Sequence, residues 1–271
     1  MTRVFRKLAS ILVLSASASL PAAADTAHIA VAANFAAPMK VLTARFEQAT
    51  GHTLALSSGS TGKFYAQIKN GAPFDVLLAA DDATPARLLH EGDAVATRNY
   101  AIGKLALWSA DLHLIDGTDA VLKQNRFGKL AVANPKLAPY GAAAREALAK
   151  LGLLDAVAGK FVVGENIGQT YQFAASGNAD LGFVALSQIM QNGKLTRGSM
   201  WLVPSQLYSP IRQDAALLKH GADNAAARAL LEAHQRRVVV AEGILGLQRK
   251  GELVAGAVPR ERRLHLGEDA A

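Results

Sequence analysis

Four turns in the sequence are suited to holding an anion. Each follows an apolar run and precedes an amphipathic segment, which places it between a strand and a helix. The first turn of a helix has main-chain N–H groups without partners and about half a positive charge. Several such turns directed at one point would bind an anion without any cationic side chain. The four turns are Ala33-Asn34-Phe35, Gly59-Ser60-Thr61-Gly62-Lys63, Pro139-Tyr140-Gly141 and Glu165-Asn166-Ile167-Gly168.

Each turn also has a structural alternative. Asn34 and Ser60 or Thr61 belong to residue types that cap helices. The glycines can serve only to shape the turns, and the ring of Tyr140 can pack in a core or on a lobe surface. Ile167 can reach a ligand only through its main-chain N–H. The prediction of an anion site therefore depends on the four turns together.

The elements that must position these turns alternate along the chain. Strands are expected at residues 28–33, 53–58, 74–80, 104–110, 129–135, 160–166, 181–187, 201–204 and 214–220. Helices are expected at residues 35–50, 64–70, 81–92, 142–152 and 168–177. This alternation is typical of parallel or mixed sheets with helices on both faces, in which ligands bind at the carboxyl ends of the strands. The length favours two such lobes over one very wide sheet.

Composition excludes several classes of protein. The chain has 271 residues, 51% hydrophobic, so it can form a sizeable core. With no cysteine, it has no disulfide, thiolate metal site, cysteine nucleophile or lipidated N-terminal cysteine. The net charge of +7 includes +3 from the first seven residues and +2 from residues 234–271. The nearly neutral remainder argues against a nucleic-acid-binding protein.

The first 24 residues are predicted to be a secretory signal peptide. A basic start precedes a 13-residue apolar stretch, and Ala22-Ala23-Ala24 offers a cleavage site before Asp25. A buried N-terminal helix is the alternative. The apolar stretch is too short to span a bilayer, and no later stretch of about 20 residues is continuously apolar. We therefore expect a freely soluble periplasmic protein that does not span the membrane.

Other chemistries find less support. Gly59–Lys63 is similar to a phosphate-binding loop, but Ser57 replaces its first glycine and Phe64 its final hydroxyl residue. There is no G-x-S-x-G nucleophile turn, and the seven histidines have no zinc-site spacing. Asp81-Asp82 can bind a metal, but a strand-end acid and helix cap at Asp82 or Thr84 is favoured. A secreted hydrolase or transferase, or the effector-binding part of a regulator, remain as alternatives.

At the four turns the sequence resembles the periplasmic molybdate-binding proteins of ABC importers. The resemblance covers most of residues 28–220 and includes IAVAANFAAPM, SSGSTGKFYAQIKNGAPFDVLLAAD, LAVANPKLAPYGAAAREALAKLG and GENIGQTYQFAASGNADLGFVALSQI. It implies an α/β fold of the two-lobed periplasmic binding type (type II) with a ligand cleft between the lobes. Lobe 1 would comprise residues 25–105 and 206–271, and lobe 2 residues 106–205. The sequence after about Ala233 departs from the family.

The resemblance also implies a ligand set and a role. The residues expected to bind molybdate are Asn34, Thr61, Tyr140 and Ile167, with Ala33 and Ser60 beside them. Some members have a tyrosine where this chain has Ala185, and Tyr140 would supply a phenol instead. The implied protein is a monomer without catalysis or cofactor that delivers molybdate, and tungstate with it, to an ABC permease. A receptor for sulfate or another tetrahedral oxyanion is the alternative.

Overall fold

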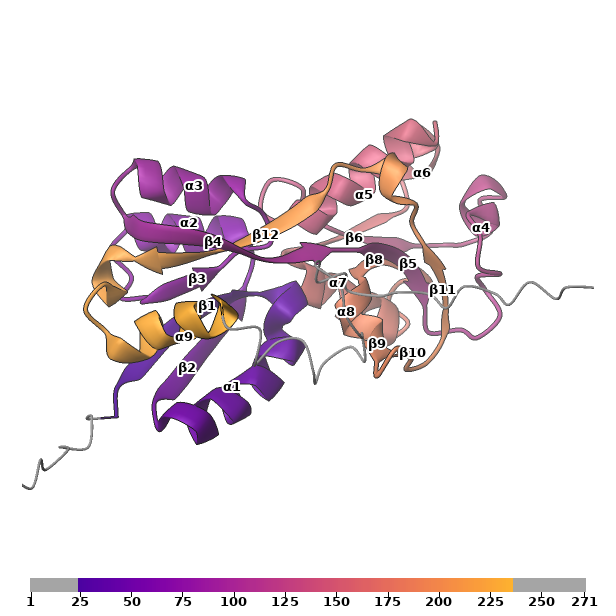
Figure 1. Ribbon diagram of the computed structural model, residues 1–271. Helices are drawn as coiled ribbons and strands as arrows, with labels where there is room; N and C mark the ends of the chain where they lie inside the picture. Colours follow the sequence, from indigo (N-terminus) through magenta and orange to yellow (C-terminus); the bar gives the residue numbers. More distant parts are fainter. Residues whose placement is uncertain (1–23, 236–271) are drawn as a thin grey trace, which may run out of the picture.

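Two five-stranded mixed sheets form the two halves of the molecule (Figure 1). The computed structural model describes residues 24–235. The first sheet has the order β2-β1-β3-β12-β4, with β1 at Thr26–Ala32, β2 at Thr53–Gly59, β3 at Val76–Leu78, β4 at Ala94–Gly103 and β12 at Ile211–Leu218. The second has the order β11-β5-β8-β6-β7, with β5 at Leu105–Ser109, β6 at Leu130–Ala133, β7 at Phe161–Gly164, β8 at Leu181–Ala185 and β11 at Ser199–Leu202. A small hairpin pairs β9 (Met190–Gln191) with β10 (Lys194–Leu195).

Helices cover both faces of each sheet. On the first sheet, one face holds α1 (Ala36–Thr50) and α9 (Ala225–Gln235), and the other holds α2 (Thr61–Lys69) and α3 (Ala83–His90). On the second sheet, one core includes α4 (Ala120–Lys123), α5 (Pro139–Lys150) and α6 (Leu154–Ala158), and another includes α7 (Ile167–Ala175) and α8 (Leu186–Ile189). Three short 3-10 helices complete the described chain: η1 (Ala33–Phe35), η2 (Ser205–Leu207) and η3 (Lys219–Gly221).

Strand β1 shows why the apolar runs of this sequence form central strands. Ile29 and Val31 pack in the core beside α1 and α9, whereas Ala30 packs in the core beside α2 and α3. A strand buried on both faces is apolar throughout rather than alternating. The helix that follows ends at Gly51, whose φ of 75° places it in the left-handed conformation that closes helices.

The predicted α/β fold with two lobes is confirmed. The sequence did not reveal β4 of the first sheet or the two short strands β9 and β10 of the hairpin. Of these three, β4 is the one that bears on the site. It lies at the edge of the first sheet, paired with β12 alone among the described strands, and its middle residues Thr97, Arg98 and Asn99 are polar. An edge strand with polar residues gives no continuous apolar run. Its omission mattered for the site, because β4 carries Tyr100 and ends at Gly103.

The chain crosses between the sheets twice. Only Lys104 separates β4 of the first sheet from β5 of the second, and residues 203–210 lead from β11 back to β12. We call the first sheet with its helices lobe 1 and the second lobe 2; boundaries near residues 105 and 206 remain a prediction. Residues 1–23 of the predicted signal peptide (residues 1–24), and the part of the divergent end that follows residue 235, lie outside the described residues. Within residues 24–235, no helix has both the length and the apolar character needed to cross a bilayer.

Candidate ligand site

The four predicted turns meet at one small pocket between the lobes. The pocket has a volume of about 10 Å³. Its walls come from the carboxyl ends of strands and the helix starts that follow them, in both lobes. The lining residues are Ala32, Ala33, Asn34, Gly59, Ser60, Thr61, Ala80, Ala138, Pro139, Tyr140, Asn166 and Ile167. The structure therefore brings together all six residues of the predicted ligand set, whose role in binding stays a prediction.

Each turn begins a helix at the pocket wall. The starts are Ala33 for η1, Thr61 for α2, Pro139 for α5 and Ile167 for α7. Proline suits the first position of α5 because an N–H there has no intrahelical acceptor. The start of α7 is fixed by Asn166, whose Oδ1 accepts the Gln169 N–H at 3.0 Å. The pocket wall is thus rich in main-chain N–H groups that the helices themselves leave unused.

Three buried polar side chains face this region from lobe 1, and none caps a helix. The Asn34 Nδ2 donates to Gln213 Oε1 at 2.9 Å. Ser60 occupies the cap position of α2 without a side-chain hydrogen bond to that helix. The Thr61 hydroxyl accepts the Ala80 N–H at 2.9 Å, so its own hydrogen is left to donate elsewhere. The capping alternative is therefore not observed at these positions.

Two atoms in the pocket wall have no hydrogen-bond partner. Within the described part of the chain, three buried side-chain polar atoms are unpaired, and Asn34 Oδ1 and Ser60 Oγ are two of them. The third, Thr43 Oγ1, lies in α1 outside the pocket. A buried polar atom without a partner costs about 1–3 kcal/mol, so such atoms are rare and call for an explanation. A polar ligand in the pocket would provide it for the Ser60 hydroxyl, which can donate or accept, whereas Asn34 Oδ1 can only accept and needs a donor.

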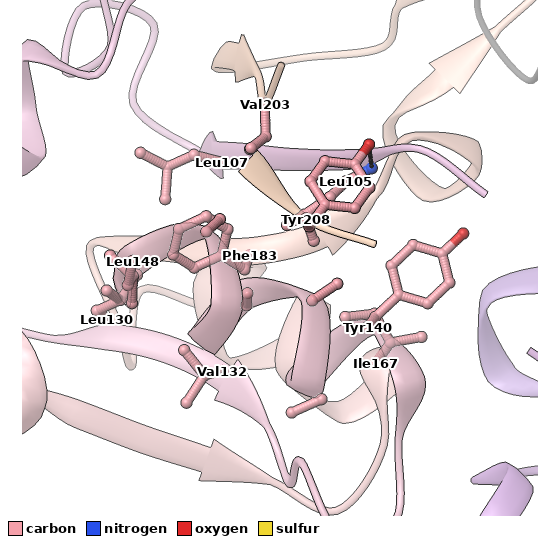
Figure 2. Close-up of a cluster of buried hydrophobic side chains, with 14 of the residues drawn as sticks. Leu105, Leu107, Leu130, Val132, Tyr140, Leu148, Ile167, Phe183, Val203 and Tyr208 are labelled. Carbon is pink, nitrogen blue, oxygen red and sulfur yellow. Dashed lines mark hydrogen bonds between the residues drawn. The ribbon is translucent and has the colours of Figure 1, made fainter. Parts of the chain in front are cut away.

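Tyr140 has an apolar and a polar role at once. Figure 2 shows Tyr140 and Ile167 at one edge of the lobe 2 core, with the Tyr140 hydroxyl directed away from the other side chains. That hydroxyl accepts a hydrogen bond from Gln213 Nε2 at 3.1 Å, across the lobe boundary. Burial raises the pKa of the Tyr140 phenol, which therefore keeps its proton at neutral pH. The Ile167 side chain is buried in the same core, leaving its main chain for the pocket.

The pocket wall contains no charged residue. Asp81 follows Ala80 of the pocket wall and borders an adjoining groove, which shares Ala80, Ala138 and Pro139 with the pocket. Its Oδ1 accepts the Thr84 N–H at 2.8 Å. Burial raises the pKa of the Asp81 carboxyl. The carboxylate that accepts a main-chain N–H at the start of α3 is thus that of Asp81. Asp82 occupies the N-cap position, but its side chain makes no hydrogen bond to the helix. Within the described range, no cluster of histidine and carboxylate residues could hold a metal ion.

The two lobes touch around the pocket. The Gly62 N–H of α2 donates to Leu137 O in lobe 2 at 3.0 Å. The Ser187 hydroxyl of α8 donates to Asn34 O at 2.8 Å. Lys63 and Glu165 form an ion pair between the second and fourth turns. The lobes are therefore in a closed arrangement, and the polar contacts described here are a few individual hydrogen bonds and one ion pair, which a hinge motion can break.

Removing one of these contacts tests whether closure supports binding. We expect Ser187→Ala to weaken anion binding about fivefold, because one neutral hydrogen bond contributes about 1 kcal/mol to the closed state. Calorimetric titration measures this effect. The matched control is Ser176→Ala, whose hydroxyl bonds within its own helix region to Phe173 O, and it should bind as the wild type does. Equal affinity of both variants would show that this contact has no part in closure.

The sequence does not point to Gln213 or Ser187 as residues that contact Asn34. Gln213 lies in β12, 179 residues from Asn34, and is 2% exposed. Ser187 lies 153 residues from Asn34. Neither stands beside a turn with unusual chemistry, so no local pattern points to them. The sequence has one indication of Gln213: it is a polar residue at a buried position of a strand whose other buried residues are apolar.

Comparisons with known proteins agree with this architecture. Residues 27–233 match the family described as bacterial extracellular solute-binding protein. The molybdate-binding protein ModA of Azotobacter vinelandii is 56% identical over 226 residues, covering 82% of this chain and 90% of that protein. The Rhodobacter capsulatus protein of the same name is 49% identical over 232 residues, covering 85% and 90%. The solved structure of the Azotobacter vinelandii periplasmic molybdate-binding protein has a TM-score of 0.75 and 41% identity, covering 77% of this chain and 92% of that one. The chain therefore belongs to the bacterial extracellular solute-binding proteins.

Proposed function

We propose that this protein captures molybdate in the periplasm and delivers it to an ABC importer, without catalysing a reaction. The observation that carries the proposal is the pocket between the lobes, where four helix starts and the unpaired buried hydroxyl of Ser60 meet without any charged side chain. Relatives at 56% and 49% identity are named for molybdate binding, and both are solute-binding proteins rather than enzymes.

The chemistry of the wall fits a fully deprotonated oxyanion. Molybdate is a dianion near neutral pH, and its four oxygens accept hydrogen bonds only. Burying it is costly unless those oxygens are well bonded. Hydrogen bonds to a charged partner contribute about 1.5–3 kcal/mol each. A wall whose main-chain N–H groups and hydroxyls donate also disfavours hydrogen phosphate, whose proton needs an acceptor. The Asp81 carboxyl lies outside this wall, in an adjoining groove.

Each residue of the ligand set has a specific donor to offer. The Thr61 and Ser60 hydroxyls are buried, and the first has its hydrogen free. Tyr140 and Ile167 stand in the first turns of α5 and α7, where their main-chain N–H groups lack intrahelical acceptors. Asn34 offers its side-chain amide, and Ala33, beside it, its main chain at the start of η1. Because the pocket measures about 10 Å³, we expect a slight outward movement of the lobes as the ion enters.

Selectivity follows from size. Sulfate is smaller than molybdate and would leave some fixed donors unfilled, which lowers its affinity. Tungstate has nearly the same size and charge, so we expect it to bind as molybdate does. We also propose that the receptor is a monomer, is exported by the segment at residues 1–24, and is recognised by its permease in the closed form.

A thermal-shift panel tests the function. Ligand that binds only the folded state stabilises it by about 2.7 kcal/mol at a concentration of 100 Kd. We expect molybdate and tungstate to raise the midpoint of unfolding markedly, and sulfate and phosphate at equal ionic strength to leave it nearly unchanged. A larger shift with sulfate would favour the alternative receptor. No shift with any of the four anions would contradict the proposal.

A further inference from the structure

A chain of buried polar groups lies behind the pocket and ends at Asn34. The Asn34 Nδ2 donates to Gln213 Oε1 at 2.9 Å, and Gln213 Nε2 donates to the Tyr140 hydroxyl at 3.1 Å. The Tyr100 hydroxyl lies 3.0 Å from the same Gln213 Oε1 and 2.8 Å from Ala79 O. Gln213, which is not in the predicted ligand set, is thus at the centre of a network that joins the two lobes.

In this arrangement the Asn34 amide offers the pocket the wrong atom for an anion. Its Nδ2 is engaged with Gln213, and its Oδ1 is buried without a partner. An oxyanion presents only acceptors, so it would meet the Asn34 Oδ1 acceptor to acceptor. One Nδ2 hydrogen is donated to Gln213, and the Asn34 side chain also hydrogen-bonds the Tyr140 hydroxyl, which engages the second. Turning the amide directs Nδ2 at the ion and lets molybdate gain a hydrogen bond from this side chain.

The neighbouring hydrogens allow Asn34 and Gln213 to turn together. The Tyr100 hydroxyl has one hydrogen but lies close to two acceptors, Ala79 O and Gln213 Oε1. If the Gln213 amide is turned, Nε2 donates one hydrogen to the Tyr100 hydroxyl and the other to Asn34 Oδ1. The Tyr100 hydrogen then belongs to Ala79 O, and the Tyr140 hydroxyl donates to Gln213 Oε1. Every hydrogen has one acceptor, and Asn34 Nδ2 is released to the pocket.

We propose that Gln213 is the positioning residue that orients the Asn34 amide toward the bound anion, by turning in concert with it. This inference rests on the proposed function. A phenol can donate or accept, so Tyr100 and Tyr140 accommodate either orientation of Gln213 without moving. It also gives Tyr140 two separate tasks: its hydroxyl holds Gln213, and its main-chain N–H faces the ion.

A double-mutant cycle in the full chain tests this role. Gln213→Met removes the polar groups with little change in side-chain length, and Asn34→Ser replaces the amide with a hydroxyl that needs no orientation by an amide. By molybdate calorimetry, we expect Gln213→Met to weaken binding about fivefold in the wild type and less than about twofold beside Asn34→Ser. Equal losses in both backgrounds would show a merely structural role for Gln213 and overturn the inference.

Two further readouts keep the outcomes distinct. In the unmutated protein, the side-chain NH₂ resonances of Asn34 and Gln213 should both shift when molybdate saturates the site, and unmoved Gln213 resonances would overturn the paired turning even if Gln213→Met fails to fold. A wild type that binds no molybdate would contradict the proposed function and this inference with it. Binding of molybdate with no coupling between the two positions would refute only the role of Gln213.

Discussion

Thr61→Val is expected to weaken molybdate binding by about 10- to 100-fold, because it removes a hydrogen bond to a charged ligand worth about 1.5–3 kcal/mol. The Thr61 side chain is 1% exposed at the start of α2, in the wall of the pocket. Its oxygen already accepts the Ala80 N–H at 2.9 Å, so its hydroxyl hydrogen is left to donate to a ligand in the pocket. Valine keeps the branched shape and loses both bonds.

The same change is expected to destabilise the protein without ligand. The Ala80 N–H would be buried without an acceptor, which lowers the free energy of unfolding by about 1–3 kcal/mol. Denaturant titration gives this quantity, and calorimetry on the folded variant gives the affinity. Thr61→Ser retains the hydroxyl and should stay within about threefold of the wild-type affinity.

Thr43→Val is a matched control within the same chain. The Thr43 hydroxyl is buried in α1 without a partner and lies outside the pocket. Replacing it removes an unpaired polar atom, so stability should be unchanged or slightly higher and affinity unaffected. If Thr61→Val folds and binds molybdate as tightly as Thr43→Val does, Thr61 is not a ligand residue.

The four turns were predictable because their signals are local. A strand ending at Ala32 or Gly59, a small or polar residue, and a helix beginning at once are all written within a few residues. The general rule that ligands bind at the carboxyl ends of strands then suggests that such turns lie together. The sequence alone could not say which donors converge; the pocket wall now places Ala33 and Ile167 beside the polar side chains.

The remainder depends on contacts between distant parts of the chain. Gln213 hydrogen-bonds Asn34 and Tyr140 from β12. This strand is the last of the first sheet in sequence order, and it lies between β3 and β4. Such a pairing brings together residues 179 and 73 positions apart, and no turn or period in the sequence encodes it. The edge strand β4 has no local signal either, because its polar middle residues interrupt the apolar run and its pairing is with the distant strand β12.

Binding and lobe closure share the same atoms. Asn34 donates to Gln213 within lobe 1, while its carbonyl accepts from Ser187 in lobe 2. Gln213 in turn holds the Tyr140 hydroxyl of lobe 2. An anion that engages Asn34 and Tyr140 therefore adds contacts only where the lobes already meet, which favours the closed state by differential affinity. This is the form that a permease can distinguish from the open receptor.

Gly103→Ala should disrupt this network from outside the pocket. Gly103 ends β4, where the chain leaves the first sheet. A Cβ there would lie 2.3 Å from the Tyr140 hydroxyl oxygen and 2.6 Å from Gln213 Nε2, and both side chains are 2% exposed. Because neither has space to retreat, we expect affinity for molybdate to fall about tenfold or more and the free energy of unfolding to fall by about 1–3 kcal/mol.

The glycine effect can be separated from a general loss of stability. Gly159→Ala is the matched control, because a Cβ at that position meets nothing within 4 Å, and it should change neither quantity. If the added methyl acts by displacing the Tyr140 hydroxyl, its cost in affinity should shrink beside Tyr140→Phe, which has no hydroxyl to displace. Full additivity of the two changes would show that the methyl acts by displacing Gln213 or at the crossing at Lys104, and not through the Tyr140 hydroxyl. Wild-type affinity in Gly103→Ala would show that the network behind the pocket does not govern binding.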